Sequence, residues 1–153
     1  RWPSDEGIMT DLLHKTVVLA CPPARAFVLF TEQISEWWPP ERRHTGDPHS
    51  QLQMVESGRF WERSAEGREV ELGRVRLWDP PERLVLDWYP GTDAEHPTEV
   101  EIHFVAEGEA TRVTVLHRPT PVSAALWSSR APRYDASWAL VLAALEHASA
   151  GLP

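Results

Sequence analysis

Five runs of alternating apolar and polar residues fill positions 58–118: GRFWER (58–63), REVELGRVRLWD (68–79), RLVLDWY (83–89), TEVEIHFVA (98–106) and ATRVTVLHR (110–118). Apolar side chains at every second position are typical of β-strands that bury one face. Proline or glycine stands between most of the runs, where a chain must reverse. Because no helix-sized segment separates the runs, we predict a meander of antiparallel strands.

A strand and two short helices are predicted before the meander. The run HKTVVLACPP (14–23) indicates a strand that ends at two prolines. The segment PARAFVLFTEQISEWW (23–38) has apolar residues at helical spacing, and Pro23 suits the first turn of a helix. We expect this segment to form one short helix and, after a break, a second. Residues 41–57 are polar and predict a loop with a weak edge strand near 52–55.

The longest helix is predicted at the C-terminal end. Apolar residues fall there at i, i+4, i+7, i+8 and i+11, which makes a single broad stripe. The preceding residues 118–132 contain several prolines, so we predict a linker with one possible helical turn at 124–127. The helix is expected over about 134–149 and is long enough to cover one face of the sheet. Its stripe consists of Tyr134, Trp138, Val141, Leu142 and Leu145.

Length and composition indicate one globular domain. The chain has 153 residues, of which 42% are hydrophobic and 25% charged, so we expect a single domain over 1–153 with a flexible lead-in at 1–13. No apolar run approaches the roughly 20 residues that span a membrane, and no secretion signal is visible, so a cytoplasmic protein is expected. The net charge of −8, with arginines scattered along the chain, disfavours a nucleic-acid partner.

The sequence offers little support for metal or cofactor chemistry. The single cysteine, Cys21, excludes an internal disulfide and is interpreted as a small hydrophobic residue at a strand end. His44 and His49 flank Asp47, but a closed zinc site needs four ligands, so no metal is expected. The sequence has no GxSxG, HExxH or glycine-rich phosphate loop, so no cofactor is expected either.

Short motifs along the chain resemble the START-like (SRPBCC) superfamily, in particular its bacterial AHSA-type branch of homologues of the heat-shock chaperone ATPase activator. The resemblance covers about residues 15–148 and implies a helix-grip fold. In that α+β fold a curved antiparallel sheet wraps around a long C-terminal helix, with two short helices after the first strand and a cavity between sheet and helix. The motifs are EWWP (36–39), GRFWE (58–62), GRV (73–75), DPPERLVLDW (79–88), TEVEI (98–102) and TRVTVLHR (111–118).

The chain departs from the family pattern at two positions. Ser57 replaces the first of two glycines before the aromatic pair, and Pro119-Thr120 replaces a Gly-Trp pair after the histidine and arginine. The second change alters a loop over the expected cavity mouth. The identity of a ligand therefore does not carry over from the family.

Two ionisable residues are expected among apolar ones on the inner face. If Leu84 and Trp88 point inward, strand alternation and the family pattern place Glu62 and His117 on the same side. They are interpreted in three ways: as a structural pair with its hydrogen bonds satisfied, as polar anchors for a ligand, or as a general acid and base. The expected cavity residues are Trp38, Phe60, Glu62, Val75, Leu77, Trp88, His117, Tyr134 and Trp138.

The function expected from the resemblance is binding of a small hydrophobic molecule, of lipid, aromatic or polyketide-like character, between the sheet and the C-terminal helix. One alternative is a cyclase or dehydrase that uses Glu62 and His117. Another is a co-chaperone or protein-interaction module, which only the family name implies. For each of the eight tryptophans, plain core packing is the alternative to ligand contact.

Overall fold

The computed structural model describes residues 11–56 and 58–151. In this part of the chain seven strands form one antiparallel sheet, in the order β1-β7-β6-β5-β4-β3-β2. The predicted meander is therefore confirmed, with β1 added beside β7 and β2 at the opposite edge. The strands are β1 (Leu13–Leu19), β2 (Gln51–Met54), β3 (Arg59–Arg63), β4 (Glu69–Asp79), β5 (Arg83–Trp88), β6 (Thr98–Glu107) and β7 (Ala110–Pro119).

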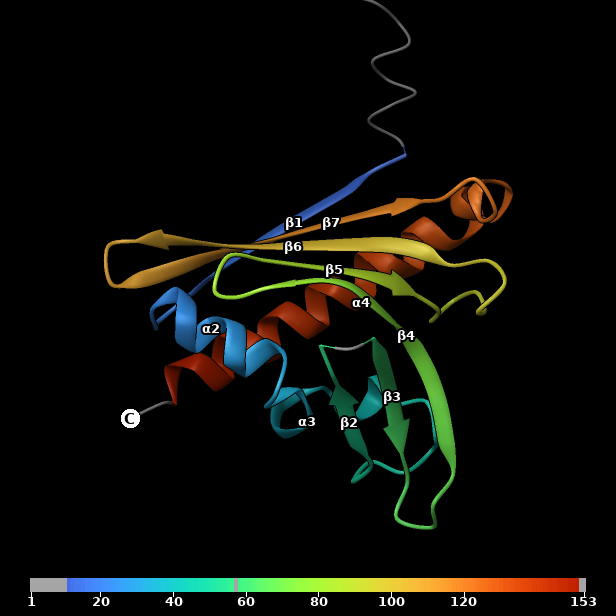
Figure 1. Cartoon of the computed structure of the whole chain (residues 1–153), viewed down its shortest axis with the longest axis horizontal. Coiled ribbons are helices and arrows are strands. Elements are labelled where there is room, and N and C mark those ends of the chain that lie inside the picture. The colour runs from blue at the N-terminus through green and yellow to red at the C-terminus, as the bar shows by residue number, and fades with distance from the viewer. Residues whose placement is uncertain (1–10, 57, 152–153) are drawn as a thin grey trace, which may run out of the picture.

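The helices lie on the concave side of the sheet (Figure 1). Helix α4 runs along that side, and α2 contacts both α4 and strand β6. The arrangement is an α+β helix-grip fold, as the sequence predicted. The helices are α2 (Pro23–Phe30), α3 (Ile34–Trp37), the short 3-10 helix η1 (Pro40–Arg42) and α4 (Ala124–Ala150).

Local sequence explains where the short helices begin and end. Pro23 occupies the first turn of α2, where a missing backbone N–H costs nothing. Helix α3 ends at Trp37, and Trp38 adopts an extended ψ of 129° ahead of Pro39 and Pro40. Residues before proline are restricted to such extended conformations. This stop fixes Trp38 at the end of a helix that faces the sheet.

One hydrophobic core fills the space between the sheet and α4. Most inner side chains of β5, β6 and β7 are buried, because strand alternation sends every second residue toward the helix. Helix α4 contributes its apolar stripe to the same core cluster. The shared core residues include Leu84, Leu86, Val100, Ile102, Val113, Val115, Trp138, Val141, Leu142 and Leu145.

A β-bulge in strand β4 overturns one predicted orientation. The register between β4 and β5 shifts between Val75 and Leu77, so Leu77 lies opposite Val85 while Trp78 lies opposite Leu84. Because Leu84 faces the core, Trp78 faces it too, and it packs against the core cluster. The prediction that Leu77 points inward is therefore wrong, since a bulge reverses the alternation beyond it.

Helix α4 begins ten residues before the predicted start. It spans 27 residues, about 40 Å, and contains Pro132 in its interior. The prolines at 118–132 predicted a linker, but the helix continues through Pro132. Trp127, one of its buried residues, stacks 5.7 Å from Tyr134, two turns further on. Burial of this early aromatic residue offsets the backbone hydrogen bond that proline cannot make.

The predicted lead-in at residues 1–13 overlaps the first strand. Residues 1–10 of the lead-in lie outside the described residues, and β1 already begins at Leu13. Within the described ranges, no helix has the length and apolar character needed to cross a membrane.

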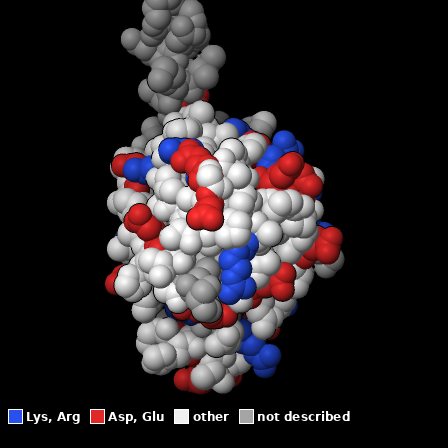
Figure 2. All heavy atoms as spheres, turned by 90° about the vertical axis from the view of Figure 1, so that its left-hand side faces the viewer, with Lys and Arg blue, Asp and Glu red and all other residues white. Residues whose placement is uncertain are grey.

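The outer face of the sheet carries pairs of opposite charge. Arg76 Nη2 lies 2.5 Å from Asp87 Oδ2, between β4 and β5. Arg118 pairs with Glu99 and, at 3.3 Å, with Glu101, between β7 and β6. On one face of the whole molecule acidic and basic side chains are likewise interspersed (Figure 2). The outer face of the sheet thus presents charged groups to solvent while the inner face builds the core.

Candidate functional site

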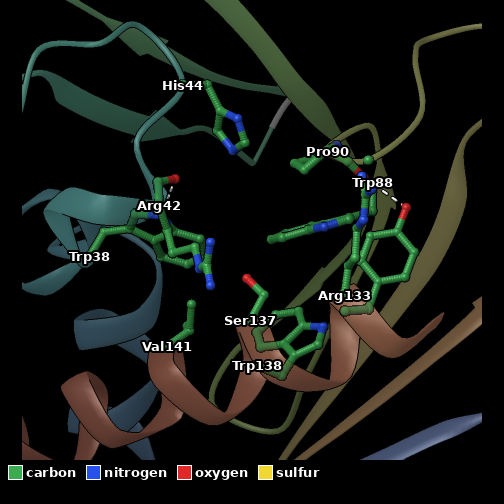
Figure 3. Close-up of a pocket in the computed structure, with 11 residues that line it drawn as sticks. Trp38, Arg42, His44, Trp88, Pro90, Arg133, Ser137, Trp138 and Val141 are labelled. Atoms are coloured by element: carbon green, nitrogen blue, oxygen red, sulfur yellow. Dashed lines mark hydrogen bonds between the residues drawn. The ribbon is translucent and has the colours of Figure 1, made fainter. Parts of the chain in front are cut away.

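A pocket of about 150 Å³ opens between α4, the segment that contains η1, and the end of β5. Figure 3 shows these three walls, with Trp38 and Arg42 on one side, Trp88 and Pro90 on another, and α4 below them. The lining residues are Trp38, Arg42, His44, Trp88, Pro90, Gly91, Arg133, Tyr134, Ser137, Trp138 and Val141.

Three indole rings form the apolar part of this pocket. Trp88 lies in the middle, with its ring centroid 6.2 Å from that of Trp38 and 5.2 Å from that of Trp138. The planes of Trp88 and Trp138 are tilted by only 33°. Each indole is at least 95% buried in the structure. Rings arranged in this way offer flat apolar surface to a flat ligand.

Hydrogen bonds to the backbone fix the pocket walls. Trp38 Nε1 donates to the carbonyl of Arg42 at 3.2 Å, which ties α3 to η1. Tyr134 donates its hydroxyl to the carbonyl of Pro90 at 2.8 Å, which ties α4 to the loop after β5. Gly91 follows with φ of +82°, and a Cβ there would lie 2.7 Å from the Tyr134 hydroxyl. Glycine is required at this position both for its conformation and for the close approach of the tyrosine.

His117 lies behind the pocket, fully buried among aromatic rings. Trp138 Nε1 donates to His117 Nδ1 at 3.0 Å, so Nδ1 is unprotonated. The proton therefore resides on Nε2, which lies 2.7 Å from Thr98 Oγ1 and donates to it. Thr98 in turn donates to the carbonyl of Trp88 at 3.3 Å. The imidazole thus links α4 to strands β5, β6 and β7.

Burial holds this imidazole neutral. Desolvation, with a smaller contribution from the positive charge of Arg118, lowers the pKa of His117 to about 3. Both ring nitrogens already have protein partners. The group in this state is a connector between helix and sheet, and its basicity is too low for a general base at neutral pH.

Glu62 is also fully buried, on strand β3. Its Oε1 accepts the backbone N–H of His44 at 2.8 Å, and its Oε2 accepts the backbone N–H of Thr45 at 2.8 Å and the hydroxyl of Ser50 at 3.0 Å. Burial opposes the charged form, but these donors outweigh it, and the pKa of Glu62 lies below its ordinary value. The carboxylate fastens the loop 44–50 to the sheet.

The structure brings together four of the nine residues expected at the cavity: Trp38, Trp88, Tyr134 and Trp138. Phe60 and Val75 are buried in the core, with Phe60 stacked 5.7 Å from Trp88. Glu62 and His117 face inward as predicted, yet they bond to separate partners and not to each other, and Leu77 lies on the outer face.

Four polar lining residues were not predicted from the sequence: Arg42, His44, Arg133 and Ser137. The first two come from the polar segment after α3, where no periodicity marks them. The other two precede Tyr134 and Trp138 by one residue. Arg133, Ser137 and Val141 follow one another at i, i+4 and i+8, a second stripe beside the apolar one, and this spacing was a usable signal.

The histidine-containing loop shows no metal cluster. Asp47 accepts the backbone N–H groups of His49 at 2.8 Å and of Ala65 at 2.9 Å, which makes its carboxylate part of a turn. Within residues 11–56 and 58–151, no group of three or more His, Cys, Asp or Glu side chains is placed to hold a metal ion.

Comparison with known proteins assigns the family. The model of the family described as "Activator of Hsp90 ATPase homolog 1-like protein" (AHSA1) matches residues 20–149. The chain belongs to the AHSA1 family. Among curated protein sequences none matches it.

The solved structures similar to this AHSA1-family chain include a resistance protein, a pyrone synthase and an Hsp90 activator. The self-sacrificing resistance protein CalC from Micromonospora echinospora is 26% identical with a TM-score of 0.67, over 92% of this chain and 95% of CalC. The anthrahydroquino-γ-pyrone synthase Txn09, complexed with SUM, is 30% identical with a TM-score of 0.50, over 70% of this chain and 75% of Txn09. An Hsp90 activator from Plasmodium falciparum is 15% identical with a TM-score of 0.51, over 72% of this chain and 74% of its own, and shows the shared fold alone.

Proposed function

We propose that this AHSA1-family protein binds a small aromatic, polyketide-like molecule in the pocket beside α4. The observation that carries the proposal is the cluster of Trp38, Trp88 and Trp138 around a hollow that opens to solvent. Ligand sites are typically concave, mostly apolar and equipped with a few polar groups. The similarity to a pyrone synthase at 30% identity supports an aromatic ligand over a lipid chain.

The size of the pocket limits how much of such a ligand it encloses. Cavities of about 150 Å³ in protein cores bind a molecule of the size of benzene. A hollow of this volume therefore encloses one aromatic ring, or two where the second projects toward the opening. The remainder of a larger polyketide would lie along the mouth, between η1 and the loop after β5.

A pair of substitutions on α4 tests the proposal. Ser137 lines the pocket, whereas Ala139 lies on the exposed side of the same helix. Ser137→Phe should fill the hollow and abolish the quenching of tryptophan fluorescence by added aromatic polyketides. Ala139→Phe adds the same ring outside the pocket and should leave quenching intact. Equal quenching in both variants, or none in the unaltered protein across aromatic, lipid and sterol probes, would reject the proposal.

A cyclase or dehydrase activity is the alternative that the similarity to Txn09 favours. Of the two residues expected to act as acid and base, His117 is too weakly basic for the role, because its pKa is lowered to about 3, so Glu62 is the candidate that is left. If Glu62 acts in the reaction, Glu62→Gln should abolish turnover and leave ligand affinity nearly intact. A parallel loss of turnover, affinity and folded stability would instead assign Glu62 the structural role that its three hydrogen bonds indicate.

A co-chaperone function rests on the family name. The Plasmodium Hsp90 activator shares too little sequence with this chain to carry its activity over. Capture of the chaperone by the full chain, and stimulation of its ATPase in a purified assay, would favour this function over ligand binding.

A further inference from the structure

The pocket lining is cationic although the protein is acidic. The chain carries a net charge of −8, yet the lining includes two arginines, Arg42 and Arg133, and, among the described residues, no aspartate or glutamate. A concave site lined by one sign of charge concentrates ions of the opposite sign. The local charge at the pocket therefore favours an anionic ligand even though the molecule as a whole repels one.

Among the described residues, no carboxylate pairs with either of these two arginines. Arg76 and Arg118 on the outer face each pair with acidic residues of a neighbouring strand. In the described part of the chain, by contrast, no ion pair involves Arg42 or Arg133. The Nε of Arg42 is moreover buried without a hydrogen-bond partner among these residues. A guanidinium group that lines a hollow and has no carboxylate partner is available to a ligand oxygen.

The two arginines approach the pocket from different elements. Arg42 extends from η1, and Arg133 and Ser137 extend from α4, on either side of the space in front of Trp88 (Figure 3). A ring that packs against Trp88 and Trp138 would therefore have guanidinium groups beyond its edge. The buried carboxylate of Glu62 does not compete for them, because three donors from the loop 44–50 already surround it.

We infer that the ligand is an aromatic acid whose ring lies among the indoles and whose carboxylate is bound by Arg42 and Arg133. This inference rests on the proposed function and narrows its ligand class. Guanidinium groups match the planar geometry of a carboxylate and form charge-assisted hydrogen bonds to it. Ser137 supplies a hydroxyl that can donate to the same group.

Two probes of equal shape test the inference. 2-Naphthoate carries the carboxylate, and 2-naphthamide replaces it with a neutral amide. Calorimetric titration at low salt should show naphthoate binding about tenfold more tightly than the amide, as expected for a charge-assisted contact. The preference should shrink as salt is added, because the arginines are partly exposed. In the double variant Arg42→Gln/Arg133→Gln naphthoate should bind no more tightly than the amide.

A matched control removes the same charge elsewhere. Arg25 is exposed on α2 and does not line the pocket, so Arg25→Gln should retain the preference for naphthoate. Equal affinity for the two probes, or a preference that survives the double variant, would overturn the inference and leave the aromatic pocket standing. Failure of both probes to bind the unaltered protein would overturn the inference together with the proposed function.

Discussion

The imidazole of His117 makes stability depend on pH in a specific window. Its pKa of about 3 in the folded chain lies below the ordinary value of 6.5, so the unfolded chain binds the extra proton first. Stability contributed by the neutral form is complete above about pH 6.5 and declines as the pH falls toward the folded pKa. The decline for one such group approaches 1.4 kcal/mol per pH unit.

Urea denaturation between about pH 6.5 and 5 measures this effect, because most carboxylates stay ionised there. We expect the free energy of unfolding to change less steeply with pH in His117→Gln, because glutamine does not titrate. The pKa of His44 is lowered as well, chiefly by burial, so the variant keeps a remaining slope of the same sign. An unchanged slope in His117→Gln would contradict the buried neutral imidazole.

Glu62 stabilises the fold as an anion, whereas His117 does so as a neutral group. Replacing Glu62 with Gln puts an amide group against backbone N–H donors, and we expect a loss of roughly 2–4 kcal/mol in the free energy of unfolding at neutral pH. Faster hydrogen exchange of His44 and Thr45 would locate the loss in the loop. The pKa of Glu62 lies below 4.5, so the difference between the two proteins should narrow as the pH falls below that value.

At the scale of elements, the pairing of β4 with β5 depends on Gly73. A Cβ on this residue would lie 2.2 Å from the backbone carbonyl oxygen of Asp87, which cannot move aside as a flexible side chain can. We expect Gly73→Ala to lower the free energy of unfolding by about 2–3 kcal/mol. Gly151→Ala is the matched control, because its Cβ would meet no atom closer than 3.7 Å. Thermal denaturation of both variants measures the two losses in stability. If Gly73→Ala and Gly151→Ala lost the same free energy of unfolding, the close contact between β4 and β5 would not be the cause.

The elements also show which features a sequence can predict. Strand alternation correctly identified the buried faces of β5, β6 and β7, because those strands run without interruption. Leu77 was misplaced because a bulge depends on how two strands pair, which no single strand reveals. The start of α4 was misplaced because Pro132 disfavours a helix locally, whereas the packing of Trp127 against His117 of strand β7 favours it.

The candidate site was predicted only in its apolar part. Large aromatic residues on known faces of strands and helices, or at a helix end, mark a core or a cavity wall, so Trp38, Trp88, Tyr134 and Trp138 were found. Arg42 ends the short helix η1, and His44 follows in a loop whose path is set by hydrogen bonds to the buried Glu62. A sequence pattern carries no periodic signal for such residues, because their position follows from tertiary contacts.

At the scale of the whole molecule, a single core predicts cooperative unfolding. One cluster contains the buried hydrophobic residues from the inner side of all seven strands and from the helices. Domains of about this size usually unfold in one step. We expect the calorimetric and van't Hoff enthalpies to agree within error. Two resolved transitions would contradict the prediction of one domain over the chain.

The hydrogen bonds that hold the pocket walls should make the protein selective among ligands. The hydroxyl of Tyr134 holds the loop after β5, Trp138 is joined to His117, and Glu62 fastens the loop 44–50. Walls fixed in this way lose little conformational entropy when a ligand binds, and they adapt poorly to a ligand of another shape. The protein should therefore discriminate sharply among isomers of one compound, in contrast to carriers that accept many hydrophobic molecules through a pliable interior.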